Sequence, residues 1–584
     1  MPRPVGLRRR RPLSRRPPSD YETLARAVHR CASNRPWLST LELNALPVFR
    51  FAPVAGAVIA PALLYALAAV PRLPGGDWRW ATIEPALLLG ALLMLPRAPA
   101  KALRGLFVVI VAGVLALTLA DWATGLAFGR PFNLGRDSQL PGFGWNVFAH
   151  AVGPVPAAAA LIAFAAVLLL LLTLLFLALG SWAQASGRDR RVLAAVLGVF
   201  IAATLVAAWL GPHKPTPVYD RLAMHVDQFQ NRHAETARFE AGLRATPPRA
   251  ETPLAGLAGK DVLFVFVESY GRTLFERALY ADTVSARLSD FERRIGEAGF
   301  AARSGWLTSP TVGGQSWLAH GTLLSGLWID SQPRYEALIA SDRVSLNRRF
   351  RQVGWRTAAV MPAITRAWPE AAWFGYDRVY ASDDLGYEGE PFNWVTMPDQ
   401  YTLAALQRAE LDRASGQPVM IEAALISSHA PWVPIPPLLD WATVGDGTVF
   451  DEYARAGDPP VEVWKDPDRV RAQYLEAIDY SLATLASFVA ERAHDDLVLV
   501  ILGDHQPAPI ITGSEASRDV PIHILSTDPA VLGAIDSWQW QTGMTPGAAT
   551  PVWRMDAFYE RFLRAFSGDV EPLPSSAAPP LRAE

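Results

Sequence analysis

Two apolar runs in the second half of this 584-residue chain end in polar residues that can bind a metal. Glu268 directly follows DVLFVFV, and the pair Asp504-His505 follows DLVLVIL and a single glycine. Two carboxylates and one imidazole form a donor set that suits a divalent cation such as Zn²⁺ or Mn²⁺. The pattern therefore predicts a metal site, provided that the two runs are strands whose ends meet. Taken alone, Glu268 is better explained as an N-capping or surface carboxylate.

The stretch TVGGQSWLAHGTLLSG, residues 311–326, offers a nucleophile. Ser316 follows the glycines Gly313 and Gly314 and begins a helical pattern, whose first-turn N–H groups and positive dipole end would attract a tetrahedral anion. A metal held nearby would lower the pKa of the serine hydroxyl and make it reactive near neutral pH. Two alternatives stay open: Ser316 is simply the N-cap of a core helix, or Thr311 is the nucleophile.

Several histidines differ in what their positions suggest. His429 lies in the segment SSHAP after the apolar run PVMIEAALI, where it could protonate a leaving oxygen or bind the transferred group. A satisfied loop histidine is the alternative interpretation. His320 is one helical turn after Ser316 and so can face the same pocket. His494, among charges at a helix end, is expected to be solvated, and His523, inside a strand, to belong to the core.

These residues need a scaffold that brings distant strand ends together, and the region after residue 256 has such a pattern. Short apolar runs alternate there with amphipathic stretches, which is typical of an α/β domain with a mainly parallel central sheet. Ligands of such sheets bind beyond the carboxyl ends of the strands. The expected strands are 261–267, 356–361, 418–426, 496–502 and 520–525, and the expected helices are 272–299, 317–326, 344–353, 398–414 and 467–493.

The first 210 residues have long uncharged apolar runs instead. About 20 apolar residues are needed to cross a bilayer as a helix, and five candidate spans occur. Arg and Lys gather in the N-terminal tail, around 97–104 and around 188–191, which places those three segments in the cytoplasm by the positive-inside rule. With five spans, the chain after about residue 211 would lie outside the cytoplasm. The candidates are 49–70, 81–96, 105–120, 154–181 and 192–210.

Charge and cysteine content narrow the function classes further. The formal net charge is −2, so nothing in the overall balance indicates a nucleic-acid partner. The arginine-rich N-terminal tail is interpreted as a topology signal next to the membrane rather than a nucleic-acid-binding arm. Cys31 is the single cysteine, so an exported domain would be held by its core without an intrachain disulfide.

The predicted organisation has five parts. A basic, partly disordered cytoplasmic N-terminus precedes five transmembrane helices, and a linker helix then leads to the catalytic domain and a disordered tail. The corresponding boundaries are 1–48, 49–210, 211–256, 257–566 and 567–584.

Together these motifs resemble the alkaline phosphatase and sulfatase superfamily. DVLFVFVESYG resembles its first strand with a metal-binding acid, LVLVILGDHQP its late Gly-Asp-His metal motif, and FGYDRVY a Gly-Tyr-Asp segment of its lipoteichoic acid synthase-like members. Five spans followed by an outer catalytic domain also match that group. The resemblance implies an extracytoplasmic sulfatase-like domain carried by a multi-pass protein of a bacterial-type inner (cytoplasmic) membrane.

The resemblance also implies roles for individual residues. One divalent ion is implied, with Mn²⁺ as the first choice and Zn²⁺, Mg²⁺ and Ca²⁺ as alternatives. A Trp and an Arg touch the substrate in the synthases, and Trp368 and Arg366 lie nearby here in reversed order. The implied metal ligands are Glu268, Ser316, Asp504 and His505, the implied catalytic residues are Ser316 and His429, and the implied substrate-binding residues are His320, Arg366 and Trp368.

The Ser316 segment departs from the sulfatase pattern, in which Cys or Ser is followed by any residue and then Pro-Ser-Arg. Leu318 replaces the proline and His320 replaces the arginine, which argues against conversion of Ser316 to formylglycine. An unmodified serine alkoxide suits phosphoryl transfer through a phosphoserine intermediate. His320 would then supply the positive group that Arg or Lys provides in related proteins.

The resulting expectation is a membrane-anchored, metal-dependent phosphotransferase. It would move a phospho-alcohol group, of the phosphoglycerol type, from a membrane phospholipid to an envelope glycan or lipid acceptor. Phosphoethanolamine transferases share five spans, but they carry outer-domain disulfides that this chain cannot form. The alternatives are a phosphoric or sulfuric ester hydrolase of the same superfamily and a non-catalytic sensor or scaffold, which the intact metal-binding set disfavours.

Overall fold

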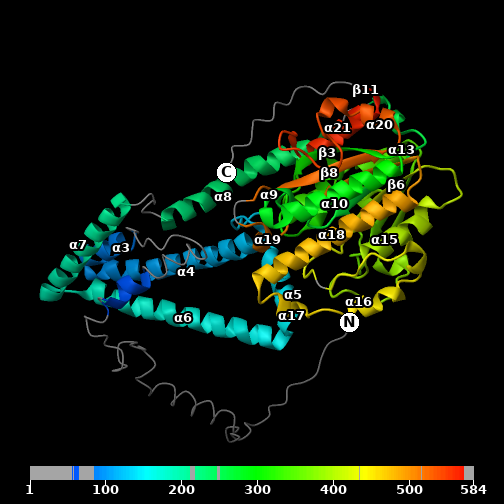
Figure 1. Cartoon of the computed structure of the whole chain (residues 1–584). Helices are drawn as coiled ribbons and strands as arrows, with labels where there is room; N and C mark the ends of the chain where they lie inside the picture. Colours follow the sequence, from blue (N-terminus) through cyan, green and yellow to red (C-terminus); the bar gives the residue numbers. More distant parts are fainter. Residues whose placement is uncertain are drawn as a thin grey trace, which may run out of the picture.

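The computed structural model describes residues 56, 58–64, 84–210, 217–245, 250–432, 434–513 and 516–570. A helical region occupies the N-terminal part, and an α/β domain follows from about residue 250 (Figure 1). The predicted basic N-terminus 1–48, Cys31 and most of the first candidate span, 49–70, lie outside the described residues.

The α/β domain is built on a nine-stranded sheet in which most strand pairs are parallel. The order is β10-β3-β8-β7-β2-β6-β4-β5, and β9 pairs with β3 off this path. The pairs β3–β8, β3–β9 and β7–β8 are antiparallel. The strand bounds are Asp261–Val267 (β2), Ala301–Thr308 (β3), Arg356–Met361 (β4), Arg378–Ala381 (β5), Val419–Leu425 (β6), Leu497–Gly503 (β7), Asp519–Ser526 (β8), Gln541–Thr542 (β9) and Val552–Arg554 (β10).

Helices cover both faces of the sheet, and the alternation of side chains along β2 shows why. Leu263, Val265 and Val267 belong to one hydrophobic core and Val262, Phe264 and Phe266 to another, as the two-residue period of a strand requires. The first core packs under α10 (Ala278–Glu297), α15 (Asp399–Leu406) and α18 (Pro467–Arg492), and the second under α11 (Ser316–Ser325), α13 (Leu346–Gln352), α20 (Pro529–Gly533) and α21 (Ala557–Phe566).

All five expected strands are present, while several short or mixed ones were not expected from the sequence. β3 has the sequence AARSGWLT, which contains no continuous apolar run. It is held in place by antiparallel pairing with β8 along its whole length, from Ala301–Ser526 to Thr308–Asp519. Tertiary pairing of this kind overrides weak local propensity. The expected helix 272–299 is divided into α9 (Thr273–Glu276) and α10, and the expected helix 398–414 ends in a π-helical turn at Gln407–Leu411.

The expectation of five membrane spans is not met in the described part of the chain. Two helices there are long and apolar enough to cross a bilayer, in segments Ala98–Phe128 and Pro154–Gln184. The second candidate span forms a helix of 11 residues, which is too short for a crossing of about 30 Å. The helices are α3 (Glu84–Met94), α4 (Arg97–Phe128), α5 (Leu140–Val152), α6 (Pro154–Gln184) and α7 (Gly187–Leu210).

A long polar helix, α8 (Pro217–Arg244), connects the helical region to the α/β domain. Its last turns pack against the second core through Phe239 and Leu243. Beyond α8, strand β1 (Ala250–Thr252) pairs with β11 (Gly568–Val570), so three residues of the segment predicted as a disordered tail form a strand.

Candidate active site and metal centre

The register of the parallel strands brings the predicted metal ligands together. Val267 at the end of β2 is opposite Gly503 at the end of β7, so Glu268 and Asp504 leave the sheet side by side. The Ser269 N–H donates a hydrogen bond of 2.8 Å to Asp504 Oδ1 across this junction. Gly503 is required here because a Cβ atom would lie 1.9 Å from the Tyr270 carbonyl oxygen.

Glu268, Asp504 and His505 form a buried cluster. One ligand atom from each lies within 4.8 Å of the others. His505 Nε2 is 3.3 Å from Glu268 Oε1 and 3.6 Å from Asp504 Oδ2. Buried carboxylates that share one imidazole are costly unless a cation compensates them, so the donor set fits a divalent metal. The predicted grouping of these three residues is what the structure shows.

The orientation of His505 fits a ligand role. Its Nδ1 lies 2.9 Å from the Gln506 carbonyl oxygen, which fixes Nδ1 as the protonated nitrogen when the ring is neutral. Nε2 is then the free nitrogen and faces Glu268 and Asp504. Backbone hydrogen bonds of this type orient metal-binding histidines in many proteins.

Ser316 reaches the same point from the other side of the cluster. It is the first residue of α11, and its Oγ donates to Glu268 Oε2 at 3.0 Å and lies 3.3 Å from His505 Nε2. Gln315, which precedes it, has a positive φ of 65°, a costly conformation for a residue with a side chain. The strained turn aims the serine at the acids. The competing candidate Thr311 instead donates to the Gly314 carbonyl oxygen at 2.7 Å, inside the turn.

The electrostatics of the three buried groups are strongly coupled. Burial would raise the pKa of Glu268, but the positive charges of His505 and His429 outweigh burial and lower this pKa to about 2. Burial and the neighbouring negative charge of Glu268 raise the pKa of Asp504 to about 6. Burial opposes the charged form of His505, but the two carboxylates outweigh it and raise its pKa. Two acids whose pKa values are driven apart are typical of a functional site.

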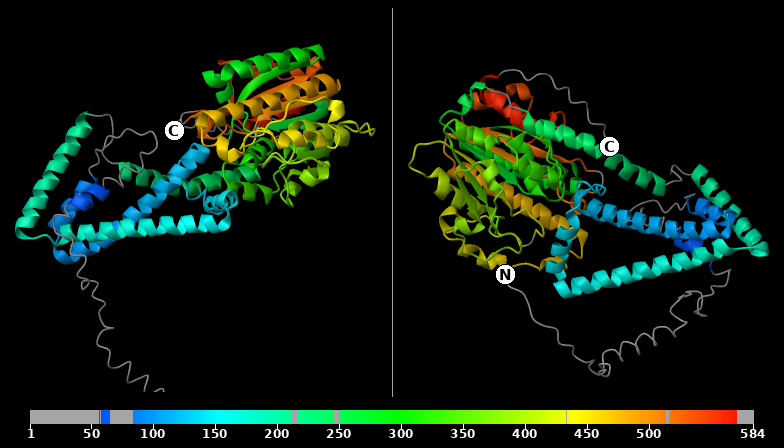
Figure 2. Two further views of the ribbon diagram at one scale, coloured as in Figure 1. Left: turned by 60° about the horizontal axis from the view of Figure 1, so that its bottom comes forward. Right: turned by 180° about the vertical axis from the view of Figure 1, so that it is seen from behind.

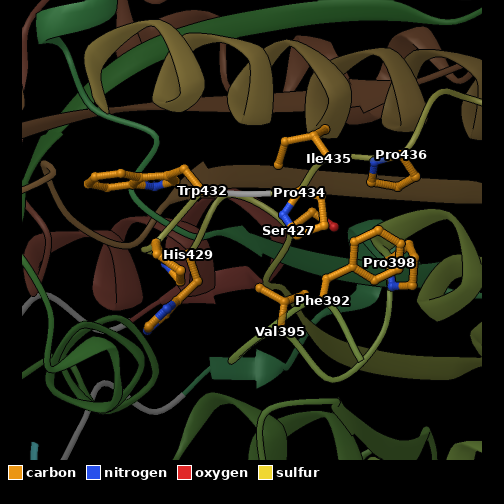
Figure 3. Close-up of a pocket in the computed structure, with 10 residues that line it drawn as sticks. Phe392, Val395, Pro398, Ser427, His429, Trp432, Pro434, Ile435 and Pro436 are labelled. Carbon is orange, nitrogen blue, oxygen red and sulfur yellow. The ribbon is translucent and has the colours of Figure 1, made fainter. Parts of the chain in front are cut away.

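His429 lies exposed at the rim of this cluster, close enough for its charge to act on Glu268. It follows β6, where the Ser428 hydroxyl donates to the Glu268 carbonyl oxygen at 2.6 Å and ties the two strand ends together. A small hollow, partly open to solvent, begins beside His429 (Figure 3). Its other walls are mainly apolar: Phe392, Val395, Pro398, Trp432, Pro434, Ile435 and Pro436.

His320, predicted to bind substrate, has a partner that sequence reasoning missed. Its Nδ1 lies 2.6 Å from Oε1 of Glu422, a fully buried carboxylate in the middle of β6. Asn347 and Tyr376 donate to the other oxygen of Glu422. The signal was present in the sequence as the single charged residue of the run PVMIEAALI. The His320 ring also stacks on Phe266, with 3.7 Å between ring centroids.

The other predicted substrate residues are Trp368 and Arg366. Trp368 packs on Phe374 and Tyr376, with ring centroids 5.6 and 6.1 Å apart, and Arg366 is exposed. The structure brings neither of them into contact with Ser316. His523 is fully buried, and burial lowers its pKa to about 3, as expected for a core histidine.

Comparisons with known proteins yield structural likeness alone. No family model and no curated protein sequence matches the chain. The lipoteichoic acid synthase LtaP from Listeria monocytogenes is 14% identical over 57% of this chain and 78% of its own, with a TM-score of 0.37. The C-terminal periplasmic domain of EcEptC from Escherichia coli, solved with Zn, is 14% identical over 49% and 78%, with a TM-score of 0.30. A phosphonate monoester hydrolase of Agrobacterium radiobacter is 12% identical over 52% and 77%, with a TM-score of 0.30.

With identities of 14% or less and TM-scores below 0.5, the substrate and the reaction have to be inferred from this chain's own residues.

Proposed function

We propose that the chain is a membrane-anchored, metal-dependent phosphotransferase of the alkaline phosphatase superfamily with Ser316 as its nucleophile. One observation carries this proposal: the Ser316 hydroxyl lies 3.0 Å from Glu268 and 3.3 Å from His505, inside a buried donor set made of two acids and an imidazole. A simple N-cap serine has no need of such neighbours.

The residues present fit a single divalent ion. Glu268, Asp504 and His505 would hold it, with the Ser316 oxygen as a further donor. When bound, the ion lowers the pKa of the serine hydroxyl and stabilises negative charge on a phosphoryl oxygen. Mn²⁺ is our first choice because carboxylate, imidazole and hydroxyl donors together suit it, and Zn²⁺, Mg²⁺ and Ca²⁺ are alternatives.

The chain's own groups account for the remaining chemistry. Ser316 Oγ attacks the phosphorus of a phosphodiester, and the bond from phosphorus to the lipid alcohol breaks. His429, exposed at the rim, donates a proton to the leaving oxygen. The phosphoryl oxygens lie at the N-terminus of α11, where Gln315 makes no side-chain capping bond and leaves the helix end open to an anion. An acceptor hydroxyl then gives its proton to His429, which is now neutral, and attacks the phosphorus of the phosphoglycerol–Ser316 diester; the bond from phosphorus to Ser316 Oγ breaks and the serine alkoxide is released.

Phosphate fits this site better than sulfate. A sulfatase of this superfamily uses a formylglycine made in a Pro-Ser-Arg context, and here Leu318 and His320 occupy the positions of the proline and the arginine. Leu318 is fully buried in the second core, so it packs rather than presenting a recognition element. We assign anion binding, the role of that arginine, to His320, whose Nδ1 contacts Glu422.

A membrane lipid is the proposed donor, and an envelope glycan or lipid the proposed acceptor. The apolar windows of Ala98–Phe128 and Pro154–Gln184 are only 11% and 6% buried within the protein, so these are not core helices of a water-soluble domain. Exposed apolar surface on this scale is stable when lipid covers it. We place the chain in a bacterial-type cytoplasmic membrane with the α/β domain outside, and we assign the transferred group to the phosphoglycerol type.

Hydrolysis is the second candidate, because His429 is exposed and water can reach the rim of the site. One experiment separates the two. The full chain is reconstituted with Mn²⁺ in phosphatidylglycerol vesicles, with and without a polyhydroxylated lipid acceptor, and diacylglycerol and water-soluble glycerol phosphate are measured. Transfer predicts diacylglycerol release that depends on the acceptor, hydrolysis predicts both products without it, and release by the Ser316→Ala variant would contradict the nucleophile assignment.

A further inference from the structure

Two charged residues of α4 lie at either end of its long uncharged segment and indicate where the helix enters and leaves the hydrocarbon core. Arg104 and Asp121 bracket the uncharged segment 105–120. The 17 residue steps from Arg104 to Asp121 correspond to about 26 Å of helix, close to the thickness of a bilayer's hydrocarbon core. Arg104 lies over the Phe176 ring at 3.8 Å, whereas Asp121 faces a different helix, α8.

Residues of three helices, α3, α4 and α8, make polar contacts near Asp121. Its carboxylate lies 2.8 Å from Arg221 and 3.4 Å from His225, both on α8. At the start of α3, Glu84 accepts a hydrogen bond of 2.7 Å from the Tyr219 N–H, also on α8. Paired charges of this kind are costly in hydrocarbon, so this level marks the outer edge of the membrane.

α4 continues beyond that level and ends against the active-site turn. The helix has 32 residues, and its last turn lies beside Gly313 and α19 (Pro509–Thr512). A Cβ atom on Gly313 would lie 2.0 Å from the Ala127 carbonyl oxygen, so the turn before Ser316 and the end of α4 pack backbone to backbone. Gly313 donates from its N–H to the Gln506 carbonyl oxygen at 2.8 Å, next to the metal ligand His505.

The segment between α4 and α5, residues 129–139, also contacts the α/β domain through side chains. Arg136 lies 3.2 Å from Asp330, and Gln139 donates to Glu336 at 3.1 Å. Within this segment, the Arg130 guanidinium donates two hydrogen bonds of 2.7 Å to the carboxylate of the buried Asp137.

α5 then crosses from the end of α4 to the start of α6 (Figures 1 and 2). Its Trp145 and Phe148 remain partly exposed, which is typical of a helix lying in the membrane interface.

We propose that the outer end of α4 is a positioning element of the active site, which holds the Gly313 turn and sets Ser316 at the height of the lipid head groups. Ala127 lies six residues beyond Asp121, or about 9 Å, which is the level of the head-group layer. The substrate is therefore a phosphodiester head group of a lipid that stays in the bilayer during reaction. This inference rests on the proposed function for its chemistry, whereas the docking and the height are properties of the fold.

Cross-linking tests the docking without any activity. In a Cys31→Ser background, Gln139→Cys and Glu336→Cys are introduced into the full chain, with a protease site between α8 and β1. A short bismaleimide should keep the two fragments joined after cleavage. The control pairs Gln139→Cys with Glu297→Cys, an exposed position at the opposite end of the sheet. Joining no better than in the control would overturn the proposal.

A depth measurement tests the height. A fluorophore on Glu336→Cys, in vesicles of phosphatidylcholine and phosphatidylglycerol, should be quenched by head-group spin labels several-fold more than by labels deep in the acyl chains. Quenching by neither label would show that the site stands away from the membrane and would refute the assigned height.

The catalytic consequence is tested by one alanine inserted between Trp122 and Ala123, which turns the end of α4 by about 100°. The rate on phosphatidylglycerol vesicles should fall at least tenfold relative to the rate on soluble bis(p-nitrophenyl) phosphate. The same insertion between Ala185 and Ser186 should leave the ratio unchanged, and an unchanged ratio in the α4 variant counts against the proposal. If the unmodified chain turns over neither substrate while cross-linking and depth are as predicted, the proposed function fails and the docking stands.

Discussion

Ser316 Oγ lies 3.0 Å from Glu268 Oε2, although 48 residues separate them and two different elements carry them. The contact exists because α11 begins where β2 ends, and a positive φ at Gln315 turns the serine toward the acid. This geometry supports our proposal that Ser316 is both a metal donor and the nucleophile.

Replacing the Ser316 hydroxyl should abolish turnover without unfolding the protein. Ser316→Ala removes the attacking oxygen, and we expect at least a 10³-fold loss of phosphodiester turnover, the order of magnitude seen when a covalent nucleophile is deleted. Ser316→Thr keeps the hydroxyl and should retain measurable activity. Steady-state rates with thermal melting as the folding control distinguish these variants, and an alanine variant with full activity would exclude the assignment.

Metal binding should stabilise the α/β domain through the acids. At 100 times the dissociation constant, a ligand that binds the folded state alone adds about 2.7 kcal/mol, which raises the Tm of a domain of this size by several degrees. Asp504→Asn should lose this Mn²⁺-dependent rise. Because Asp504 is buried beside Glu268, the metal-free Asn variant should melt no lower than the metal-free parent. A full Mn²⁺ shift in the variant would argue against Asp504 as a ligand.

Glu422 should act through His320. Glu422→Gln preserves the shape of the side chain but removes the charge that His320 Nδ1 contacts, so we expect about a tenfold lower kcat/KM, the worth of a charge-assisted hydrogen bond. Tyr376→Phe, which removes a different partner of the same carboxylate, is the matched control and should have a smaller effect. Equal losses in both variants, with matching drops in Tm, would indicate that the cluster serves only packing.

Gly503 should be intolerant of a side chain. A Cβ atom would lie 1.9 Å from the Tyr270 carbonyl oxygen, so Gly503→Ala should destabilise the domain by about 2 kcal/mol through overpacking. In Gly296→Ala, on α10, no atom lies within 4 Å of the new methyl group, and helix propensity predicts a gain of about 0.5–1 kcal/mol. Denaturant unfolding of both variants measures the contrast, which a neutral result at Gly503 would contradict.

The ion pair of His494 with Asp261, at 3.1 Å, should make a small part of the stability depend on pH. The hydrogen bond to Asp261 raises the pKa of His494 in the folded state, so the stabilisation is fully present below the unfolded value of about 6.5. It is lost as the pH rises through the higher folded value. His494→Gln should therefore lose at most about 1 kcal/mol at pH 6 and less at pH 9, because the ring is partly exposed. A larger loss at pH 9 would have the wrong sign.

The strands that end at the site were predictable because the sequence of a buried parallel strand is a continuous apolar run. DVLFVFV and DLVLVIL both became strands, and their parallel register placed Glu268 next to Asp504. β3 was not predictable, since Arg303, Ser304 and Gly305 interrupt its pattern and pairing with β8 defines it. The role of Glu422 depends on three partners distant in sequence, which no local pattern encodes.

In the helical region, the sequence predicted more membrane spans than the described residues contain. Apolar length predicted five spans, yet two described helices have the required length and hydropathy. The second expected span contains Glu84, which contacts α8 and marks the point where α3 starts. Composition alone does not encode that contact, nor the approach of α4 to the Gly313 turn.

The most direct test of the central claim is the mass of the peptide that contains Ser316. The full chain would be incubated with Mn²⁺ and phosphatidylglycerol vesicles, stopped in acid, digested and analysed by tandem mass spectrometry. We predict a phosphoglycerol adduct on Ser316 that is absent from the Ser316→Ala variant and from samples treated with a chelator. A formylglycine at position 316, or an adduct on Thr311 instead, would contradict the account.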